Sequence, residues 1–377
     1  MSLLNYVDRQ VLYAVFPLLQ KDLQLSDVQL GALASAFMLV YMCYAPLMGY
    51  LADRFNRPRL IALSALLWSG ATLVCATAKN YASLFLARTF IGVGEGGFTT
   101  IAQPFLAEHD PKEKHASVLA LFGLALPAGS ALGYVLGGLV GQHWGWRVAF
   151  ALAGIPGVFL ALLAVNLLKD KAREIQTQRP SLVDYKPLVR NKPFLQICFA
   201  QAMSTFVMGG LAAWMPMYLH RYTSLNVAQT GSIFGALVIG CGALGTYSGG
   251  KLASALLQRS KWAYSRVIAG AFIAALPFCW MTVLMTHSFL ILLFLAVALV
   301  LLFIPTGAIA ASLVATTDEK IRSMAFALNI FIIHLLGDAF SPTLMGWISD
   351  QWDLKIAVLV ASFVLLPGAL AAWRAKV

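Results

Sequence analysis

Residues 87–100 of this chain read ARTFIGVGEGGFTT. Gly92, Gly94 and Gly97 have the G-x-G-x-x-G spacing of a dinucleotide-binding loop, which must follow a β-strand and open a helix. The residues before the motif, YASLFLARTFI, are instead typical of a membrane span, and Glu95 inside the motif would repel a phosphate. We therefore predict a membrane helix whose glycines allow neighbouring helices to approach closely.

The composition supports a membrane protein. The 377 residues are 60% hydrophobic and 11% charged, with a mean hydropathy of +0.77, whereas soluble domains carry about 25% charged residues. Most apolar side chains must therefore face lipid. The net charge is +11, but the basic residues lie between apolar runs and do not cluster with stacking aromatic residues. We therefore expect no nucleic-acid partner.

Apolar runs long enough to cross a hydrocarbon core of about 30 Å recur along the chain. They predict an all-α membrane protein with twelve spans, placed near 1–20, 28–51, 59–78, 82–106, 115–141, 147–168, 193–219, 228–257, 263–286, 288–316, 322–348 and 354–373.

The basic residues indicate the orientation. With both termini in the cytoplasm, twenty of the 27 Lys and Arg residues fall in cytoplasmic segments and five on the opposite side, as the positive-inside rule requires.

The polar segment 169–192 separates six spans from six, and GYLADR at 49–54 is echoed by GKLASA at 250–255. We predict two six-helix bundles, 1–168 and 193–377, joined by a cytoplasmic linker, a plan that resembles the major facilitator superfamily.

Four charged residues lie inside the predicted spans 1–20 and 82–106. Arg88 and Glu95 are two helical turns apart and share one face. Asp8 and Arg9 are neighbours, so they point about 100° apart and cannot simply pair with each other. A charge at the centre of a span costs about 2.5–3.5 kcal/mol on insertion scales, so each should face a cavity and have a partner.

The sequence allows a structural or a functional role for each of these charges. Arg88 and Glu95 could form a static structural ion pair or part of a working site. We expect Asp8 to face the stripe of Arg88 and Glu95. Burial favours its neutral form and a nearby Arg its charged form, which a proton-coupled carrier needs; Asp8 could also be only structural.

Two further motifs carry polar residues. The loop GYLADRFNRPR at 49–59 has the acid and bases of a conformational latch, which we assign to Gly49, Asp53, Arg54 and Arg57; the alternative is a plain basic loop. A left-handed turn in this loop would be tolerated by Asn56. His334 and Asp338 are four residues apart and share a face; they are secondary site candidates or a pair that satisfies kinked backbone near Pro342.

Five quoted segments resemble one family. LLNYVDRQVL, YAPLMGYLADRFNR, RTFIGVGEGGFTTIAQP, LPAGSALGYVLGG and HLLGDAFSP together resemble the Spinster family of the major facilitator superfamily, over nearly the whole chain. The resemblance implies that Asp8, Arg9, Arg88 and Glu95 form a central substrate and coupling network, and animal relatives move lysolipids and sphingosine phosphate. Only seven residues precede Asp8, fewer than in the family. A start assigned too far downstream, a truncated product or a short first helix would each explain this, and we expect a misassigned start.

These observations predict a secondary carrier. We expect proton coupling through Asp8 and Glu95 and binding of an amphiphilic anion by Arg9, Arg88, Glu95 and Asp8. A small organic anion or drug is the alternative substrate, and a non-transporting receptor or scaffold the alternative protein. No catalytic or metal-ligand spacing predicts an enzyme or a cofactor, and the five cysteines are expected to be free, packed thiols. We expect a monomer in a bacterial inner membrane.

Overall fold

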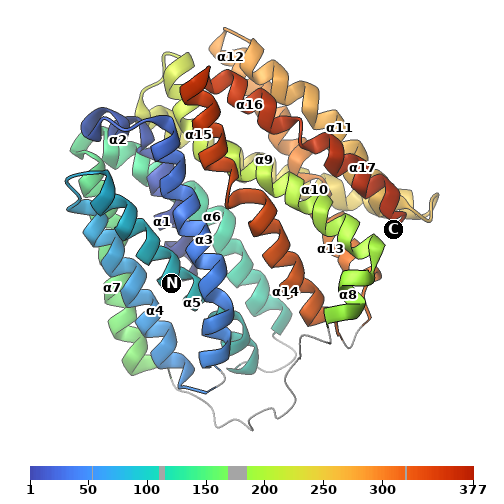
Figure 1. Ribbon diagram of the computed structural model, residues 1–377, viewed down its shortest axis with the longest axis horizontal. Helices are drawn as coiled ribbons and strands as arrows, with labels where there is room; N and C mark the ends of the chain where they lie inside the picture. The colour runs from blue at the N-terminus through green and yellow to red at the C-terminus, as the bar shows by residue number, and fades with distance from the viewer. Residues whose placement is uncertain (53, 110–114, 169–184, 319–320) are drawn as a thin grey trace. The chain divides into compact units, whose positions relative to one another are not determined.

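The computed structural model describes residues 1–52, 54–109, 115–168, 185–318 and 321–377, without the side chains of Gln103, 107–121 and Ser323. Every regular element in these ranges is a helix (Figure 1). The chain forms two compact units: Met1–Ile175 with Ala212–Ala236, and Gln176–Leu211 with Leu237–Val377. The predicted linker lies largely outside the described residues, and the predicted domain boundaries stay a prediction.

The first unit contains seven complete helices and the adjoining ends of two more, α9 and α10. The seven are α1 (Ser2–Ala14), α2 (Phe16–Leu23), α3 (Asp27–Ala52), α4 (Arg57–Ala76), α5 (Tyr81–His109), α6 (His115–Trp144) and α7 (Trp146–Leu167). Within this unit α5 packs against both α3 and α4, α7 packs against α4, and α6 packs against α1.

The second unit contains the rest of α9 (Lys192–Tyr222) and α10 (Val227–Leu257). A π-helix, η4 (His334–Asp338), interrupts one of its spans. Its other helices are α8 (Lys186–Arg190), α11 (Ala263–Leu284), α12 (Ser288–Phe303), α13 (Pro305–Ala315), α14 (Arg322–Ile333), α15 (Ser341–Gln351), α16 (Leu354–Ser362) and α17 (Leu365–Ala375).

Ten helical segments of the described chain are long and apolar enough to cross a membrane. They correspond to ten of the twelve predicted spans. The two others are 1–20, which the structure breaks into α1 and α2 at Val15, and 82–106, which belongs to α5. The break leaves α1 and α2 with 13 and 8 residues, too short to span a membrane alone, and α5 carries two charges, Arg88 and Glu95, in its apolar run. The other two charges, Asp8 and Arg9, lie in α1.

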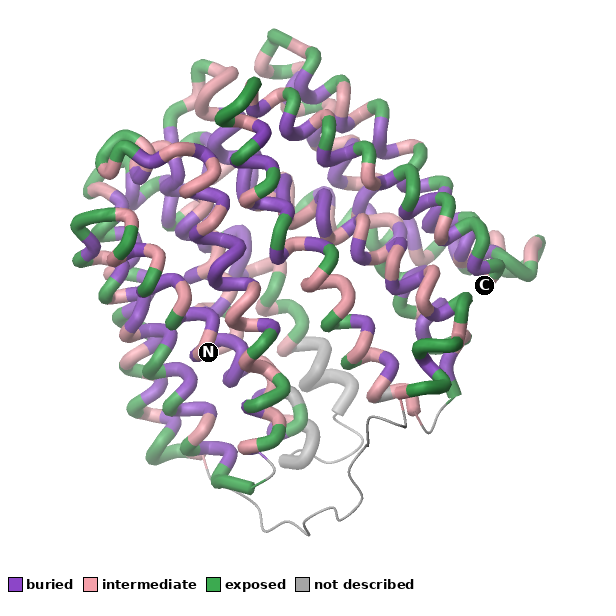
Figure 2. The backbone as a smooth tube through the Cα atoms, in the orientation of Figure 1, coloured by how far each residue is buried: buried purple, intermediate pink, exposed green. Residues whose placement is uncertain are grey.

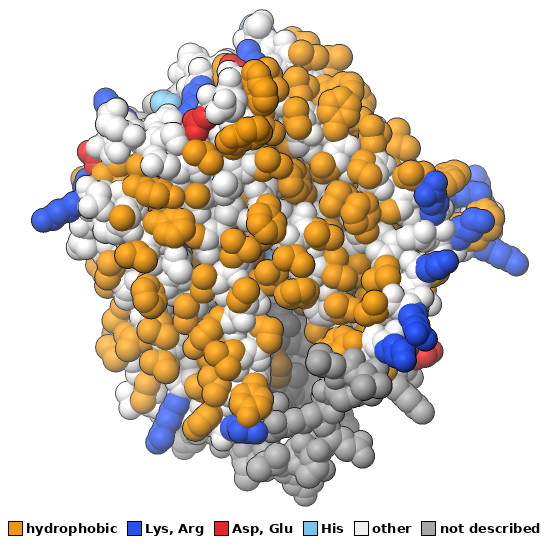
Figure 3. Space-filling model, in the orientation of Figure 1, with side chains coloured by type: hydrophobic (Ala, Val, Ile, Leu, Met, Phe, Trp, Pro, Cys, Tyr) orange, Lys and Arg blue, Asp and Glu red, His pale blue; other side chains and the backbone are white. Residues whose placement is uncertain are grey.

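Helix α7 shows how the helices divide their surfaces between lipid and protein. Its large side chains at Leu152, Ile155, Phe159 and Leu162 are about half exposed or more, and recur every three or four residues. The opposite face buries small residues such as Ala153 and Ala161. Figure 2 shows buried and exposed positions alternating along the helices, and Figure 3 shows hydrophobic side chains covering much of the visible surface. Small residues inside and large ones outside are typical of membrane helices.

The glycines of the GVGEGG motif bring α5 into contact with two helices at once. A Cβ at Gly92 would lie 2.5 Å from the carbonyl oxygen of Phe37 in α3, and a Cβ at Gly94 would lie 2.5 Å from the backbone nitrogen of Trp68 in α4. Gly97 also faces α4, where an added Cβ would meet the Ser64 hydroxyl at 2.5 Å. The prediction that these glycines serve helix packing is confirmed.

A second set of glycines holds α1 in place. Along α6, a Cβ at Gly129 would lie 2.5 Å from the carbonyl oxygen of Leu3, and one at Gly133 would lie 2.6 Å from that of Val7. The two glycines are four residues apart and so lie on one face of α6. Close contact along this face fixes the position of α1, and therefore of Asp8 and Arg9.

An ion pair joins the ends of three helices in the first unit, α2, α3 and α9. The Arg221 guanidinium, at the end of α9, donates to both carboxylate oxygens of Asp27 at 2.5 and 2.6 Å, and to Gln20 at 3.0 Å. Asp27 begins α3 and is almost fully buried. A two-pronged Arg–carboxylate contact is geometrically specific, so it fixes the register of these helix ends.

Gly94→Ala is expected to lower the free energy of unfolding by about 1–3 kcal/mol, because the new methyl group overlaps the backbone of α4. The matched control is Gly70→Ala in α4, where an added Cβ meets nothing within 4 Å, and where alanine should be neutral or stabilising. Thermal unfolding in detergent checks both. Equal melting temperatures for the two variants would contradict the packing described for α5.

Candidate functional site

The four charged residues singled out in the sequence meet inside the first unit. Helix α1 supplies Asp8 and Arg9, and α5 supplies Arg88 and Glu95. The side chains of Arg88 and Glu95 are fully buried, that of Asp8 is 1% exposed and that of Arg9 is 12% exposed. Four charges this deeply buried require partners within the protein or a ligand.

Each charge of α1 pairs with the opposite charge of α5. Arg9 Nε donates to Glu95 Oε2 at 2.5 Å, and Arg88 Nη1 donates to Asp8 Oδ1 at 3.4 Å. Asp8 and Arg9 therefore have separate partners, as their angular separation on the helix predicted. The structure brings the four predicted residues together, while their roles in coupling and binding stay predictions.

The pairs leave several hydrogen-bonding atoms of the site unused. Nε and Nη2 of Arg88, Nη2 of Arg9 and Oε1 of Glu95 are buried and have no protein partner in the described structure. A buried donor without an acceptor is unfavourable by about 1–3 kcal/mol, and by more when it is charged. Three unused guanidinium nitrogens against one unused carboxylate oxygen make the site suited to an acceptor-rich anion.

Aromatic rings from α1 and α3 surround the Arg9 guanidinium. Its central carbon lies 4.8 Å from the Tyr41 ring centre, 4.9 Å from Phe37 and 5.2 Å from Tyr6. Phe37 also lies 5.2 Å from the central carbon of Arg88. Cation–π contacts of this kind stabilise a desolvated guanidinium. Sequence reasoning missed Phe37 and Tyr41, because aromatic residues are common in membrane helices and the spacing gave no signal.

Sequence reasoning also missed Thr72 of α4. Its hydroxyl is hydrogen-bonded to Asp8 Oδ2 and also lies 2.9 Å from the carbonyl oxygen of Trp68, four residues back in the same helix. Thr72 is fully buried. A single threonine in the apolar run LLWSGATLVCA carries no recognisable pattern, so only the folded structure reveals this contact.

The secondary candidates lie in the second unit. His334 Nδ1 is 2.8 Å from Asp338 Oδ1, and both side chains are about one-fifth exposed. They are the first and last residues of η4, in which Gly337 leaves helical geometry with φ −104° and ψ −108°. A π-helical turn often accompanies a functional site. The contact also fits the second predicted role, in which the pair satisfies the kinked backbone near Pro342.

The latch motif is described only in part. Arg54 is exposed and stacks over the Tyr50 ring at 4.1 Å, while Arg57 is buried and its Nε donates to the Ala52 carbonyl at 3.3 Å. A Cβ at Gly49 would make ordinary contact with Thr100 at 3.6 Å. Asp53, which the latch requires, lies outside the described residues, so the latch stays a prediction.

Two smaller features differ from what the sequence suggested. Asn56 has φ −62° and ψ 114°, which is extended backbone. Its side-chain oxygen accepts a hydrogen bond from the Arg59 backbone nitrogen at 2.9 Å. It therefore caps the N-terminus of α4 and does not form a left-handed turn, because an Asn oxygen satisfies a free helix donor. All five cysteines are free as predicted, but Cys43 is exposed and the other four are buried, because Cys43 lies on an outward face of α3.

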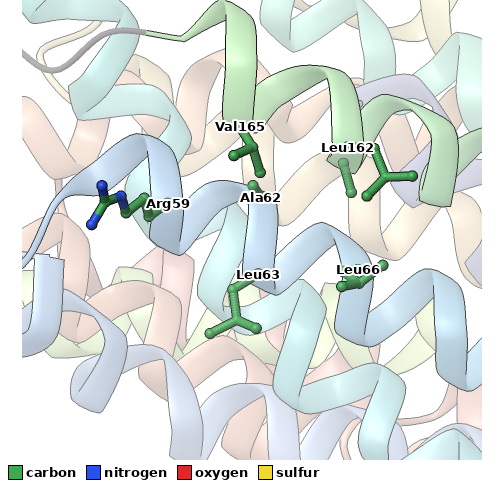
Figure 4. Close-up of a pocket in the computed structure, with 7 residues that line it drawn as sticks. Arg59, Ala62, Leu63, Leu66, Leu162 and Val165 are labelled. Carbon is green, nitrogen blue, oxygen red and sulfur yellow. The ribbon is translucent and has the colours of Figure 1, made fainter.

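A groove elsewhere in the first unit has a different character. It lies between α4 and α7, encloses about 180 Å³ and is apolar apart from Arg59 at one end (Figure 4). None of the four central charges lines it. Among the described residues, no three His, Cys, Asp or Glu side chains come together as metal ligands.

Comparison with known proteins places the chain in a family. The Major Facilitator Superfamily profile matches residues 1–317. Protein spinster homolog 1 of Xenopus tropicalis is 32% identical over 375 residues, which cover 93% of this chain and 71% of that protein. The chain belongs to the Spinster family of this superfamily. It is accordingly a multi-pass membrane transporter, and the prediction that it is not an enzyme is confirmed.

Other relatives of this Spinster family member agree with the assignment. The sphingosine-1-phosphate transporter SPNS2 of Danio rerio is 28% identical, over 98% of this chain and 81% of its own. A solved bacterial homolog of the human lysosomal transporter Spinster, inward-facing and occupied, superposes with a TM-score of 0.89 at 19% identity, over 99% of this chain and 94% of its own. The major facilitator fold predicted from the sequence is confirmed.

Arg88→Met is expected to lower the free energy of unfolding by about 3–5 kcal/mol, because it leaves the buried Asp8 carboxylate without a counter-ion. The double variant with Asp8→Asn should recover part of the loss. The control is Arg147→Met, since Arg147 pairs with Asp22 at 2.7 Å where both are nearly half exposed, and should change stability by about 1 kcal/mol or less. Simple additivity of Arg88→Met and Asp8→Asn in thermal unfolding would contradict the pairing.

Proposed function

We propose that this transporter is a proton-coupled carrier of an amphiphilic anion, such as a lysophospholipid or a sphingoid phosphate, that works by alternating access. The observation that carries the proposal is the pair of buried Arg–carboxylate contacts between α1 and α5. Such a cluster offers cationic groups to an anion and carboxylates to a proton at one location. No cofactor is needed, since the proton gradient supplies the energy.

Arg88 is the proposed anchor of the anionic head group. Two of its three guanidinium nitrogens are buried without a protein acceptor, and its contact with Asp8 is long at 3.4 Å. A phosphate group could accept from both nitrogens, which is the geometry that arginine favours. Arg9, with one unused nitrogen and its three aromatic neighbours, is the second cationic contact.

Asp8 and Glu95 are the proposed proton carriers. Each carboxylate balances one arginine in the present arrangement. An anion that binds the arginines competes with these carboxylates and so favours their protonation. Conversely, deprotonation restores the ion pairs and favours release. Binding of the anion and of the proton would therefore help each other, which is the linkage that co-transport requires.

Other parts of the proposal follow from the topology predicted from the sequence. Asp53, Arg54 and Arg57 would form a cytoplasmic latch at the α3–α4 connection, with Gly49 in contact with α5. His334 and Asp338 of the second unit are the secondary site candidates. The protein would be a monomer in a bacterial inner membrane with both termini in the cytoplasm.

A small polar solute is the second candidate substrate. Solved structures of the nucleoside transporter NupG and of a D-xylose–proton symporter share the fold, with TM-scores of 0.77 and 0.74 at 13% and 16% identity. The fold alone therefore does not select a lipid. The names of the SPNS2 and plant spinster relatives, which refer to sphingosine-1-phosphate and sphingolipids, favour the amphiphile.

The head-group assignment predicts how binding depends on Arg88. Lysophospholipids and sphingoid phosphates should raise the melting temperature of purified protein, and Arg88→Ala should weaken their affinity on the order of 10- to 100-fold through loss of charged hydrogen bonds. Each variant is compared with its own ligand-free melting temperature, and the exposed Arg147→Ala is the control. Stabilisation by small anions or drugs alone would move the assignment to the second candidate.

The coupling assignment predicts the behaviour of Glu95→Gln. Glutamine keeps the shape and can still accept from Arg9, so substrate should bind, while uptake driven by an inward proton gradient into proteoliposomes should be abolished. Asp22→Asn, which alters an exposed carboxylate, should transport normally. Intact proton-driven uptake by Glu95→Gln would remove Glu95 from the coupling mechanism.

A further inference from the structure

Thr72 contacts two hydrogen-bond acceptors but has one hydroxyl hydrogen. Its oxygen is hydrogen-bonded to Asp8 Oδ2 and lies 2.9 Å from the Trp68 carbonyl oxygen. A hydroxyl donates once and accepts through two lone pairs, so it can donate to only one of these oxygens at a time. The hydrogen-bond arrangement around Thr72 must therefore depend on whether Asp8 carries a proton.

We infer that Thr72 is the positioning residue of Asp8 and that its hydroxyl reverses direction when Asp8 gains or loses its proton. This inference rests on the proposed proton coupling and adds the residue that adapts the site to both protonation states. With Asp8 ionised, Thr72 donates to Oδ2. With Asp8 protonated on Oδ2, the carboxyl donates to Thr72 and Thr72 donates to Trp68.

The reversal conserves every atom. One proton from water adds to Asp8 Oδ2 and forms the O–H bond. The Thr72 hydrogen stays bound to its own oxygen and turns by rotation about the Cβ–Oγ1 bond from the carboxylate toward the Trp68 carbonyl, while Oγ1 stays in place. Threonine in a helix commonly donates to the carbonyl four residues back, so the second state uses a favourable geometry that the helix already offers.

The two oxygens of Asp8 have different partners, which makes the arrangement work. Oδ1 faces Arg88 Nη1 at 3.4 Å, and Oδ2 faces Thr72. A proton on Oδ2 therefore leaves Oδ1 free to accept from Arg88. Without the hydroxyl, the carboxyl would lose a partner in both states, and an unsatisfied buried polar group is costly.

The other groups around Asp8 do not offer the same adaptability. Arg88 of α5 and the neighbouring Arg9 can only donate, and Glu95 of α5 already accepts from Arg9. Cys75 of α4 is close enough to interact electrostatically with Asp8, but a thiol is a weak donor and acceptor. On its α6 side, α1 meets Gly129 and Gly133, which present no side chain.

The inference is tested with variants that separate the hydroxyl from the shape of the side chain. Thr72→Val keeps the shape and removes the hydroxyl, Thr72→Ala removes it without adding volume, and Thr72→Ser keeps it. The control is Thr89→Val: Thr89 of α5 donates to the Phe85 carbonyl at 2.9 Å, four residues back, with no carboxylate contact in the described structure.

Infrared difference spectroscopy follows the protonation of Asp8 directly, with its carboxyl band assigned by the loss of that band in Asp8→Asn. The ionised carboxylate loses a stronger, charge-assisted hydrogen bond than the neutral acid does. Thr72→Val and Thr72→Ala should therefore move the titration midpoint upward by about 0.5–1 pH unit. Thr72→Ser and Thr89→Val should titrate as the unaltered protein does.

The pH profile of proteoliposome uptake is measured on the same variants and should move with the infrared midpoint. An unchanged midpoint in folded Thr72→Val or Thr72→Ala would overturn the inference. If the infrared midpoint shifts as expected but uptake by the unaltered protein ignores the proton gradient, the proposed coupling fails and the role of Thr72 stands.

Discussion

Charge buried where a helix crosses a membrane is the constraint on which the structure depends. Arg88 and Glu95 lie within α5 and are fully buried, and Asp8 on α1 is nearly so. None of these charges is tolerable alone, because a lone ion at membrane depth is strongly unfavourable. Helices α1 and α5 must therefore come close enough for Arg9 to meet Glu95 and for Arg88 to meet Asp8.

Glycines hold each of these two helices against its neighbours. Gly92 and Gly94 let α5 contact α3 and α4, and Gly129 and Gly133 let α6 contact α1. Without a hydrophobic driving force between helices in lipid, such backbone contacts are a main source of packing energy. The packing also brings Phe37 beside both guanidinium groups, so helix packing and the electrostatics of the site have the same structural origin.

The sequence predicted the parts of this arrangement that follow from insertion into a membrane. Length and hydropathy indicate the spans, and the unfavourable burial of charge is enough to identify Asp8, Arg9, Arg88 and Glu95. The same reasoning cannot find Thr72 or Phe37, because a threonine or a phenylalanine inside a membrane helix carries no signal until its neighbour in space is known. Asn56 was misjudged since one residue type suits both a left-handed turn and a helix cap, and only the backbone geometry separates them.

In the proposed mechanism, anion binding at the arginines and proton binding at the carboxylates are linked. Proteoliposomes that contain a trapped pH indicator, with no pH gradient imposed, test it most directly. If the claim holds, an inward gradient of a phosphorylated amphiphile should by itself move protons across the membrane, and the proton movement should vanish in Asp8→Asn. Substrate entry without proton movement, measured on the same vesicles, would contradict the account.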